Sequence, residues 1–287
     1  LLQGSRGYYA KDTSAHRTIQ ENGKMLPEVG YVTDRFGDAA ARFIDEYAEQ
    51  PFFLFVSFTA PHGPLQAKES DLELLADIEP IKRRKYAGLV KSLDDAVGVV
   101  LASLEKNDLL DRTLVVFTND NGGQTLTGAN NFPLRGRKGD PWEGGVRVPM
   151  AMQWPGHIQA GSVIDDAVSS LDFLPTFVTL HGGKIDPAWQ LDGIDLWNSL
   201  NQVGLDETGA VQPARAELVL HLNAWEFPRD ATDMSVRATL VNASLVAGSI
   251  IVNGTWKLIV GEEYSDVFSP DSDSGTDGCE MMPEPDA

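Results

Sequence analysis

Apolar residues recur along the chain in runs whose spacing predicts alternating helices and strands. Helical spacing over residues 33–50 predicts an amphipathic helix, with Thr33 or Asp34 as its N-cap. The continuous apolar run at residues 52–58 is typical of a short strand covered on both faces. Helical spacing returns over residues 81–106. The positions expected to face inward on this second helix are Tyr86, Leu89, Val90, Leu93, Val97, Val100, Leu101 and Leu104.

Further strands and a helix follow. Residues 113–117 form a β-branched apolar run that predicts a buried strand, and residues 150–154 predict another that stops at a Pro-Gly pair. Residues 172–181 predict a helix that ends at two glycines. The order of strand, helix and strand predicts a βαβ unit. We therefore expect an α/β fold with a mixed, largely parallel sheet that is flanked by helices.

The pattern changes towards the C-terminus, where short strands replace long helices. Residues 217–222 and 237–240 are strand-like. Residues 250–260 predict a hairpin, because Asn253-Gly254 between two apolar runs favours a type I′ turn. We therefore expect a smaller antiparallel sheet in this part of the chain.

These patterns divide the chain into three parts. Residues 1–200 are expected to belong to the α/β domain, although residues 1–33 are polar, lack periodicity and predict mostly loop. Residues 201–261 are expected to form the antiparallel subdomain. Residues 262–287 contain nine acidic residues and no Lys or Arg, which predicts a solvated, disordered tail.

The composition narrows the class of protein. A chain of 287 residues with 42% hydrophobic residues can bury a substantial core. It contains no run of 18 apolar residues, so no membrane span is expected. The balance of 23 basic against 42 acidic residues gives a net charge of −19 and disfavours nucleic acid as a partner.

Candidate chemistry follows the strand at residues 113–117. Asp120 and Asn121 supply a carboxylate and an amide oxygen at the carboxyl end of that strand, where open α/β sheets place their sites. Such hard oxygen ligands suit Ca²⁺ or Mg²⁺. Between residues 133 and 148, four basic side chains outweigh two acidic ones, a local charge of 4 − 2 = +2 that suits a bound oxyanion. The basic residues are Arg135, Arg137, Lys138 and Arg147.

Longer motifs indicate a family. The segment DNGGQTLTGANNFPLRGRKGDPWEGGVR occupies residues 120–147, FFLFVSFTAPHGPLQ residues 52–66, and LDFLPTFVTLHGG residues 171–183. In this order they resemble the sulfatase family of the alkaline phosphatase superfamily, most closely the arylsulfatase B group. The resemblance implies an alkaline-phosphatase-like α/β domain with a smaller C-terminal antiparallel sheet.

The resemblance also assigns roles to single residues. Asp120 and Asn121 match two ligands of the family's divalent cation, expected to be Ca²⁺ with Mg²⁺ as the alternative. Lys138 matches the lysine that contacts the sulfate, and His62 matches the histidine near the leaving-group oxygen, a candidate general acid. For Arg135 and Arg137 two roles stay open, contact with substrate or support of the loop, and Arg135 is included with Lys138 and His62 among the expected substrate-binding residues. We expect His62, Lys138 and the two metal ligands to converge on one cleft.

One family element is missing from the sequence. Sulfatases begin with a strand that ends in paired aspartates, followed by a Cys-x-Pro-Ser-Arg segment whose Cys, or Ser, becomes the formylglycine nucleophile. None of the sixteen prolines follows a Cys or Ser by two positions, and the single cysteine, Cys279, lies in the tail. We therefore expect a C-terminal fragment of a sulfatase, with formylglycine upstream and no activity in the fragment alone.

The expected function is hydrolysis of sulfate esters of sugars or aryl alcohols. Two alternatives stay open: a phosphate or phosphonate ester hydrolase of the same superfamily, and a non-catalytic truncated or pseudo-sulfatase. The family resemblance implies a secreted, periplasmic or lysosomal location.

Overall fold

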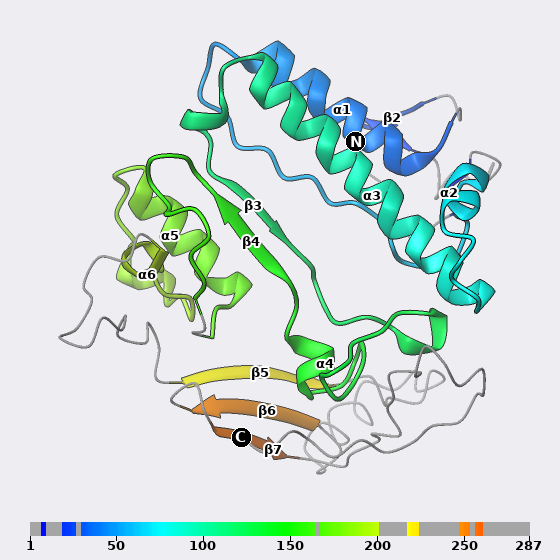
Figure 1. The fold of residues 1–287 in the computed structure, drawn as a ribbon. Coiled ribbons are helices and arrows are strands. Elements are labelled where there is room, and N and C mark those ends of the chain that lie inside the picture. Colours follow the sequence, from blue (N-terminus) through cyan, green and yellow to red (C-terminus); the bar gives the residue numbers. More distant parts are fainter. Residues whose placement is uncertain are drawn as a thin grey trace. The chain divides into compact units, whose positions relative to one another are not determined.

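The computed structural model describes residues 7–9, 19–26, 30–164, 167–200, 217–223, 247–252 and 256–260 (Figure 1). These residues divide into two compact units. Unit 1 contains the described residues up to Leu114 together with Gln124–Asn130. Unit 2 contains Val115–Gly123 and the described residues from Asn131 onwards.

Unit 1 is built on two long helices that pack against each other. They are α1 (Val32–Tyr47) and α3 (Ile81–Lys106), and the short helix α2 (Glu69–Leu74) also packs on α3. A Cβ atom built on Gly37 of α1 would lie 3.0 Å from the Cβ of Ala96 on α3, so small residues let the helices approach closely. The strands β1 (Gln20–Glu21) and β2 (Lys24–Met25) form a short antiparallel ladder.

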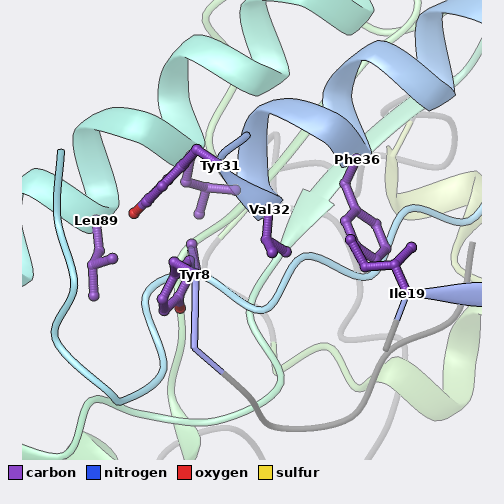
Figure 2. Close-up of a cluster of buried hydrophobic side chains, with 8 residues drawn as sticks. Tyr8, Ile19, Tyr31, Val32, Phe36 and Leu89 are labelled. Carbon is purple, nitrogen blue, oxygen red and sulfur yellow. The ribbon is translucent and has the colours of Figure 1, made fainter. Parts of the chain in front are cut away.

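The core of unit 1 gathers side chains from separate parts of the sequence. Figure 2 shows aromatic and aliphatic side chains from α1, α3 and the residues before them pointing toward one another. The buried cluster consists of Tyr8, Ile19, Tyr31, Val32, Phe36, Ala60, Leu89 and Leu93. Burial of apolar surface of this kind is the main stabilising contribution to the unit.

The predicted helices of unit 1 are confirmed, with differences at particular residues. The helix expected at residues 81–106 has these bounds, and Asn107 is its C-cap. Val90, expected to face inward, is 42% exposed, so that assignment is wrong. Neither Thr33 nor Asp34 caps α1, because the N-cap is Tyr31, two residues before Thr33, and it makes no side-chain capping bond.

The strand expected at residues 52–58 is not present in the described structure. The segment is extended, but no described segment forms a ladder with it. Its side chains alternate between half-buried and exposed positions, and Phe53 and Phe55 are 74% and 79% exposed. The expectation of burial on both faces is therefore wrong for the chain as described, because the segment has no neighbouring strand within it.

Unit 2 contains the strands that precede and follow the candidate site. Strand β3 (Val115–Thr118) pairs antiparallel with β4 (Met150–Gln153). The strand predictions at residues 113–117 and 150–154 are thus confirmed in place. The expected burial of β3 is not confirmed, because Phe117 near its end is 38% exposed. Since β3 pairs antiparallel and residues 52–58 form no strand, no βαβ unit is formed within the described residues.

A helical segment follows β4. The predicted helix at residues 172–181 is α5 (Phe173–Leu180), preceded by a 3₁₀ turn at Ser170–Asp172 and ended at Gly182, whose φ is +73°. The carboxylate of the fully buried Asp172 accepts backbone N–H bonds from Ser169 and Ile194 at 2.8 and 3.0 Å. A short helix, α6 (Trp197–Leu200), follows. The buried carboxylate is therefore a structural cap that ties two loops together.

The C-terminal part of the chain forms an antiparallel sheet. Its order is β5 (Glu217–Asn223), β6 (Ala247–Val252) and β7 (Trp256–Val260), in which Val252 pairs with Trp256. This confirms the strands expected at residues 217–222 and the hairpin at 250–260. The predicted strand at residues 237–240, the turn Asn253-Gly254 and the acidic tail lie outside the described residues. Within the described chain, no helix is long and apolar enough to cross a bilayer.

Candidate active site

Asp120 and Asn121 lie in a tight turn directly after β3, which we call the metal turn (residues 120–123). The side chain of Asp120 is exposed, and the side chain of Asn121 is half-buried. The Asn121 amide nitrogen donates to the carbonyl oxygen of Gly122 at 3.1 Å. That bond uses the nitrogen of the side chain and leaves its oxygen, the atom that a hard cation prefers.

Glycines join the metal turn to the segment that precedes β4. We call that segment the lysine loop (residues 131–147), and it includes the short helix α4 (Glu143–Val146). The N–H of Gly122 donates to the carbonyl oxygen of Gly145 at 2.9 Å. A Cβ atom built on Gly122 would overlap the carbonyl oxygen of Gly144, so backbone packs directly on backbone here.

Lys138 lies at a turn inside the lysine loop. Its backbone N–H donates to the carbonyl oxygen of Gly123 at 3.1 Å, which links it to the metal turn. The turn is closed by Asp140, whose carboxylate accepts from the N–H of Arg137 at 2.9 Å. Lys138 is half-buried, and the ion pairs of the described residues do not include it. Its ammonium group is therefore not neutralised by an acidic partner among those residues.

Arg135 supports the shape of the lysine loop. Its guanidinium carbon lies 3.8 Å from the ring centroid of Trp142, a close cation–π contact. Its carbonyl oxygen also accepts the N–H of Gly144. Both contacts are within the loop and support its shape, and contact of Arg135 with substrate stays a prediction.

His62 lies in unit 1, in the loop that follows the extended segment 52–58. Its side chain is exposed, and Nδ1 lies 2.8 Å from the carbonyl oxygen of Gly63. A carbonyl oxygen can only accept, so this contact is a hydrogen bond in the tautomer that carries its proton on Nδ1. The backbone of His62 is held on both sides: its N–H donates to Thr59 and its carbonyl accepts from the hydroxyl of Tyr8 at 2.7 Å.

The support of His62 by Tyr8 was not anticipated from the sequence. Tyr8 is 1% exposed and stacks on Tyr31, with ring centroids 5.5 Å apart (Figure 2). Burial raises the pKa of the Tyr8 hydroxyl well above its usual range, so the group stays protonated and remains a donor at physiological pH. The backbone N–H of Tyr8 and the hydroxyl of Tyr31 both bind Gln66, at 2.7 and 3.0 Å. Tyr8 and Tyr31 thus fix the loop that presents the histidine, through His62 and Gln66.

The structure brings some of the predicted site residues together. Asp120, Asn121, Arg135 and Lys138 all lie in unit 2, in two segments whose backbones are joined by the bonds from Gly122 to Gly145 and from Lys138 to Gly123. His62 lies in unit 1, so its convergence with the other four stays a prediction. No group of three or more His, Cys, Asp or Glu side chains that could hold a metal occurs in the described ranges.

Comparison with known proteins assigns the chain to a family. A family model described as Sulfatase matches residues 4–183, which is more than half of the chain. The chain belongs to the sulfatase family. It is 37% identical over 153 residues to mouse arylsulfatase J, covering 53% of this chain and 26% of that protein. It is 34% identical over 213 residues to a sulfatase of Formosa agariphila, covering 69% of this chain and 37% of that protein.

Solved sulfatase structures resemble this chain in fold. Ps i-CgsB, solved in complex with k-i-k-neocarrahexaose, is 35% identical with a TM-score of 0.70, covering 83% of this chain and 48% of its own. A second neighbour, BT4656 in complex with its substrate D-glucosamine-2-N,6-O-disulfate, has a TM-score of 0.62 at 18% identity and supports the fold alone. The match covers 48% of Ps i-CgsB and 64% of BT4656, and this sulfatase chain covers 26% of arylsulfatase J and 37% of the Formosa agariphila sulfatase.

Proposed function

We propose that this sulfatase chain provides the metal turn and the sulfate-binding lysine of a sulfuric ester hydrolase that acts on sulfated sugars or aryl sulfates. The observation that carries the proposal is the bond from the Lys138 N–H to Gly123. It ties a half-buried cation to the turn that holds Asp120 and Asn121. A metal ion and an ammonium group held in this way can act on the same oxyanion.

Asp120 and Asn121 would hold a divalent cation, Ca²⁺ with Mg²⁺ as the alternative. Their oxygens fit a hard cation in kind but not in number, because Ca²⁺ takes six to eight oxygen ligands. The remaining ligands are expected in a segment upstream of this chain, together with the formylglycine that attacks sulfur. When bound, the cation polarises a sulfuryl oxygen as a Lewis acid.

Lys138 and His62 would act at opposite ends of the bond that breaks. Lys138 neutralises negative charge that develops on the sulfuryl oxygens. His62, protonated at Nε2, gives a proton to the leaving oxygen and so allows a poorly leaving alkoxide to depart. The bond from Nδ1 to Gly63 orients the ring for this transfer.

One relative supports the proposed sugar substrate, and one segment of the chain supports a larger sheet. The relative crystallised with k-i-k-neocarrahexaose is 35% identical to this chain, which supports a carbohydrate as the substrate. The exposed Phe53 and Phe55 in an extended segment support its pairing as a strand of a largely parallel sheet in the longer protein. We propose the same division as above, residues 1–200, 201–261 and 262–287.

The purified 287-residue chain is expected to show no turnover of 4-nitrophenyl sulfate. Covalent catalysis needs an activated nucleophile, and no Cys or Ser lies in the required Pro context. The measurement is release of nitrophenolate with Ca²⁺ present. The matched experiment uses the chain extended by its upstream coding sequence, which should hydrolyse the ester.

Three results would count against the proposal. Turnover by the 287-residue chain that Lys138→Ala abolishes would place the nucleophile inside it. Activity of the extended chain on 4-nitrophenyl phosphate but not on the sulfate would favour the phosphate ester alternative. An extended chain that carries no Cys or Ser in the required context would favour a non-catalytic sulfatase.

In the extended enzyme, His62→Ala should harm sugar sulfates far more than activated aryl sulfates. Nitrophenolate leaves without a proton, whereas a sugar alkoxide needs one, so the loss in kcat/KM should be about a hundredfold for the sugar and under about tenfold for the aryl ester. His181→Ala is the matched control, because its Nδ1 also lies 2.8 Å from a carbonyl, that of Phe177. Equal losses on both esters would remove His62 from the general-acid role.

A further inference from the structure

Asn131, at the start of the lysine loop, binds both parts of the site through its side chain. Its Oδ1 accepts the N–H of Gly123 at 2.9 Å. Its Nδ2 donates to the carbonyl oxygens of Gly123 and Gly136, both at 2.9 Å. We infer that Asn131 is the positioning residue that holds the metal turn and the lysine loop in one fixed geometry.

The three partners of Asn131 specify an amide in one orientation. An N–H group must face an acceptor and two carbonyls must face donors, so only one placement of the amide oxygen and nitrogen satisfies all three. The N–H and the carbonyl oxygen of Gly123 both bond to this one side chain. The pattern is that of two residues that exchange a pair of hydrogen bonds across an antiparallel ladder. Aspartate keeps the acceptor but brings a negative charge against two carbonyl oxygens, and leucine keeps only the shape.

The position of these bonds explains why Lys138 depends on them. The carbonyl oxygen of Gly123 accepts from Asn131 and also from the N–H of Lys138. Gly136, the second carbonyl that Asn131 holds, lies two residues before Lys138 and has a φ of +99°. Asn131 thus holds the lysine loop at Gly136, just before Lys138. It also holds Gly123, the residue whose carbonyl oxygen accepts the Lys138 N–H.

This role rests on the proposed function, in which Lys138 and the metal ligands act on one sulfate group. Reacting groups must be held to within a fraction of an ångström for such a pair to be effective. Asn131 touches neither substrate nor metal in this account. Its effect is to set the separation between the ammonium group and the metal turn.

The first test measures amide hydrogen exchange by NMR in the 287-residue chain, for the wild type, Asn131→Leu and Asn131→Asp. Both variants should lower the protection of the Gly123 and Lys138 amides about tenfold at pH 8, because each removes hydrogen bonds that close the loop. The amides of the β3–β4 ladder should keep their protection. Gln124→Ala is the matched control, since Gln124 also caps backbone in this connection, at Leu126, and does not bind Gly123.

The aspartate variant supplies a readout that a general structural lesion would not change. When its carboxyl group is protonated it again offers a donor and an acceptor. Protection factors at Gly123 and Lys138, which are already corrected for the intrinsic exchange rate, should therefore recover in part in Asn131→Asp between pH 8 and about pH 4, where a carboxyl group with the ordinary aspartate pKa of about 4 becomes protonated. Asn131→Leu should show no such recovery. Unchanged protection in both variants, or loss spread evenly over unit 2 without recovery in Asn131→Asp, would overturn the inference.

A second measurement separates this inference from the proposed function. Inorganic sulfate is titrated into the wild type, Asn131→Leu and Lys138→Ala, and the shift of the backbone amide at position 138 is followed. Sulfate binding that both variants weaken about tenfold or more supports the coupling of Asn131 to a Lys138 site. Wild-type binding that Asn131→Leu leaves unchanged would overturn it. No binding to the wild type counts against the proposed function, and the exchange data then decide the role of Asn131 alone.

Discussion

Replacement of Lys138 by alanine is expected to lower kcat of the extended sulfatase about a hundredfold. The ammonium group meets charge that is largest in the transition state, and loss of one such contact typically costs roughly 3 kcal/mol. KM should change much less. The charge of the bound ester is already spread over the sulfate oxygens before reaction, so the ammonium group contributes less to binding the ester than to the transition state. The measurement is steady-state turnover of 4-nitrophenyl sulfate at saturating Ca²⁺.

The control for this experiment is Lys184→Ala. Lys184 is an exposed lysine of the same unit, and its removal lowers the net charge of the chain equally. It should leave kcat within about twofold, because exposed charges act weakly across water and salt. If Lys138→Ala raised KM with kcat unchanged, Lys138 would bind the substrate and transition state equally, and its proposed role would be wrong.

The helices could be predicted from the sequence because their hydrogen bonds are local. The apolar spacing at residues 81–106 corresponds to α3 at both ends, and Asn107 marks a helix end that depends on no distant residue. The helix expected at residues 33–50 ends earlier, at Tyr47. The segment 52–58 was predicted less well. A strand exists only where another strand pairs with it, and the described chain supplies no such neighbour.

The candidate site was predictable where its chemistry lies in a contiguous motif. Asp120, Asn121 and Lys138 are recognisable because the residues between them form one long family motif. Tyr8 and Asn131 were not recognised, since each acts through backbone groups that the fold brings near. Tyr8 reaches His62 across 54 positions, and Asn131 reaches Gly123 across eight. An Asn in a loop usually satisfies neighbouring backbone groups, so its sequence position alone does not single it out.

The glycines around the site are expected to have a large effect on the stability of unit 2 rather than on the chemical step. Gly122→Ala is expected to destabilise unit 2 by about 3 kcal/mol, because the added methyl group would overlap the Gly144 carbonyl and a backbone cannot rotate away as a side chain can. The melting temperature of the 287-residue chain should fall by roughly 10 °C. The bond from the Gly122 N–H to Gly145 should be lost with it, which separates the metal turn from the lysine loop.

Gly98→Ala provides the matched control and should act in the opposite direction. Gly98 lies within α3, and a Cβ atom built there meets no atom within 4 Å. Alanine should stabilise the helix by up to about 1 kcal/mol, because it loses less backbone entropy than glycine. Thermal unfolding followed by circular dichroism measures both variants, and amide exchange at Gly123 and Lys138 locates the damage. A Gly122→Ala chain that melts like the wild type with both amides still protected would show that the metal turn does not rest on the Gly144 backbone. The close approach of the two loops would then not be what fixes Lys138.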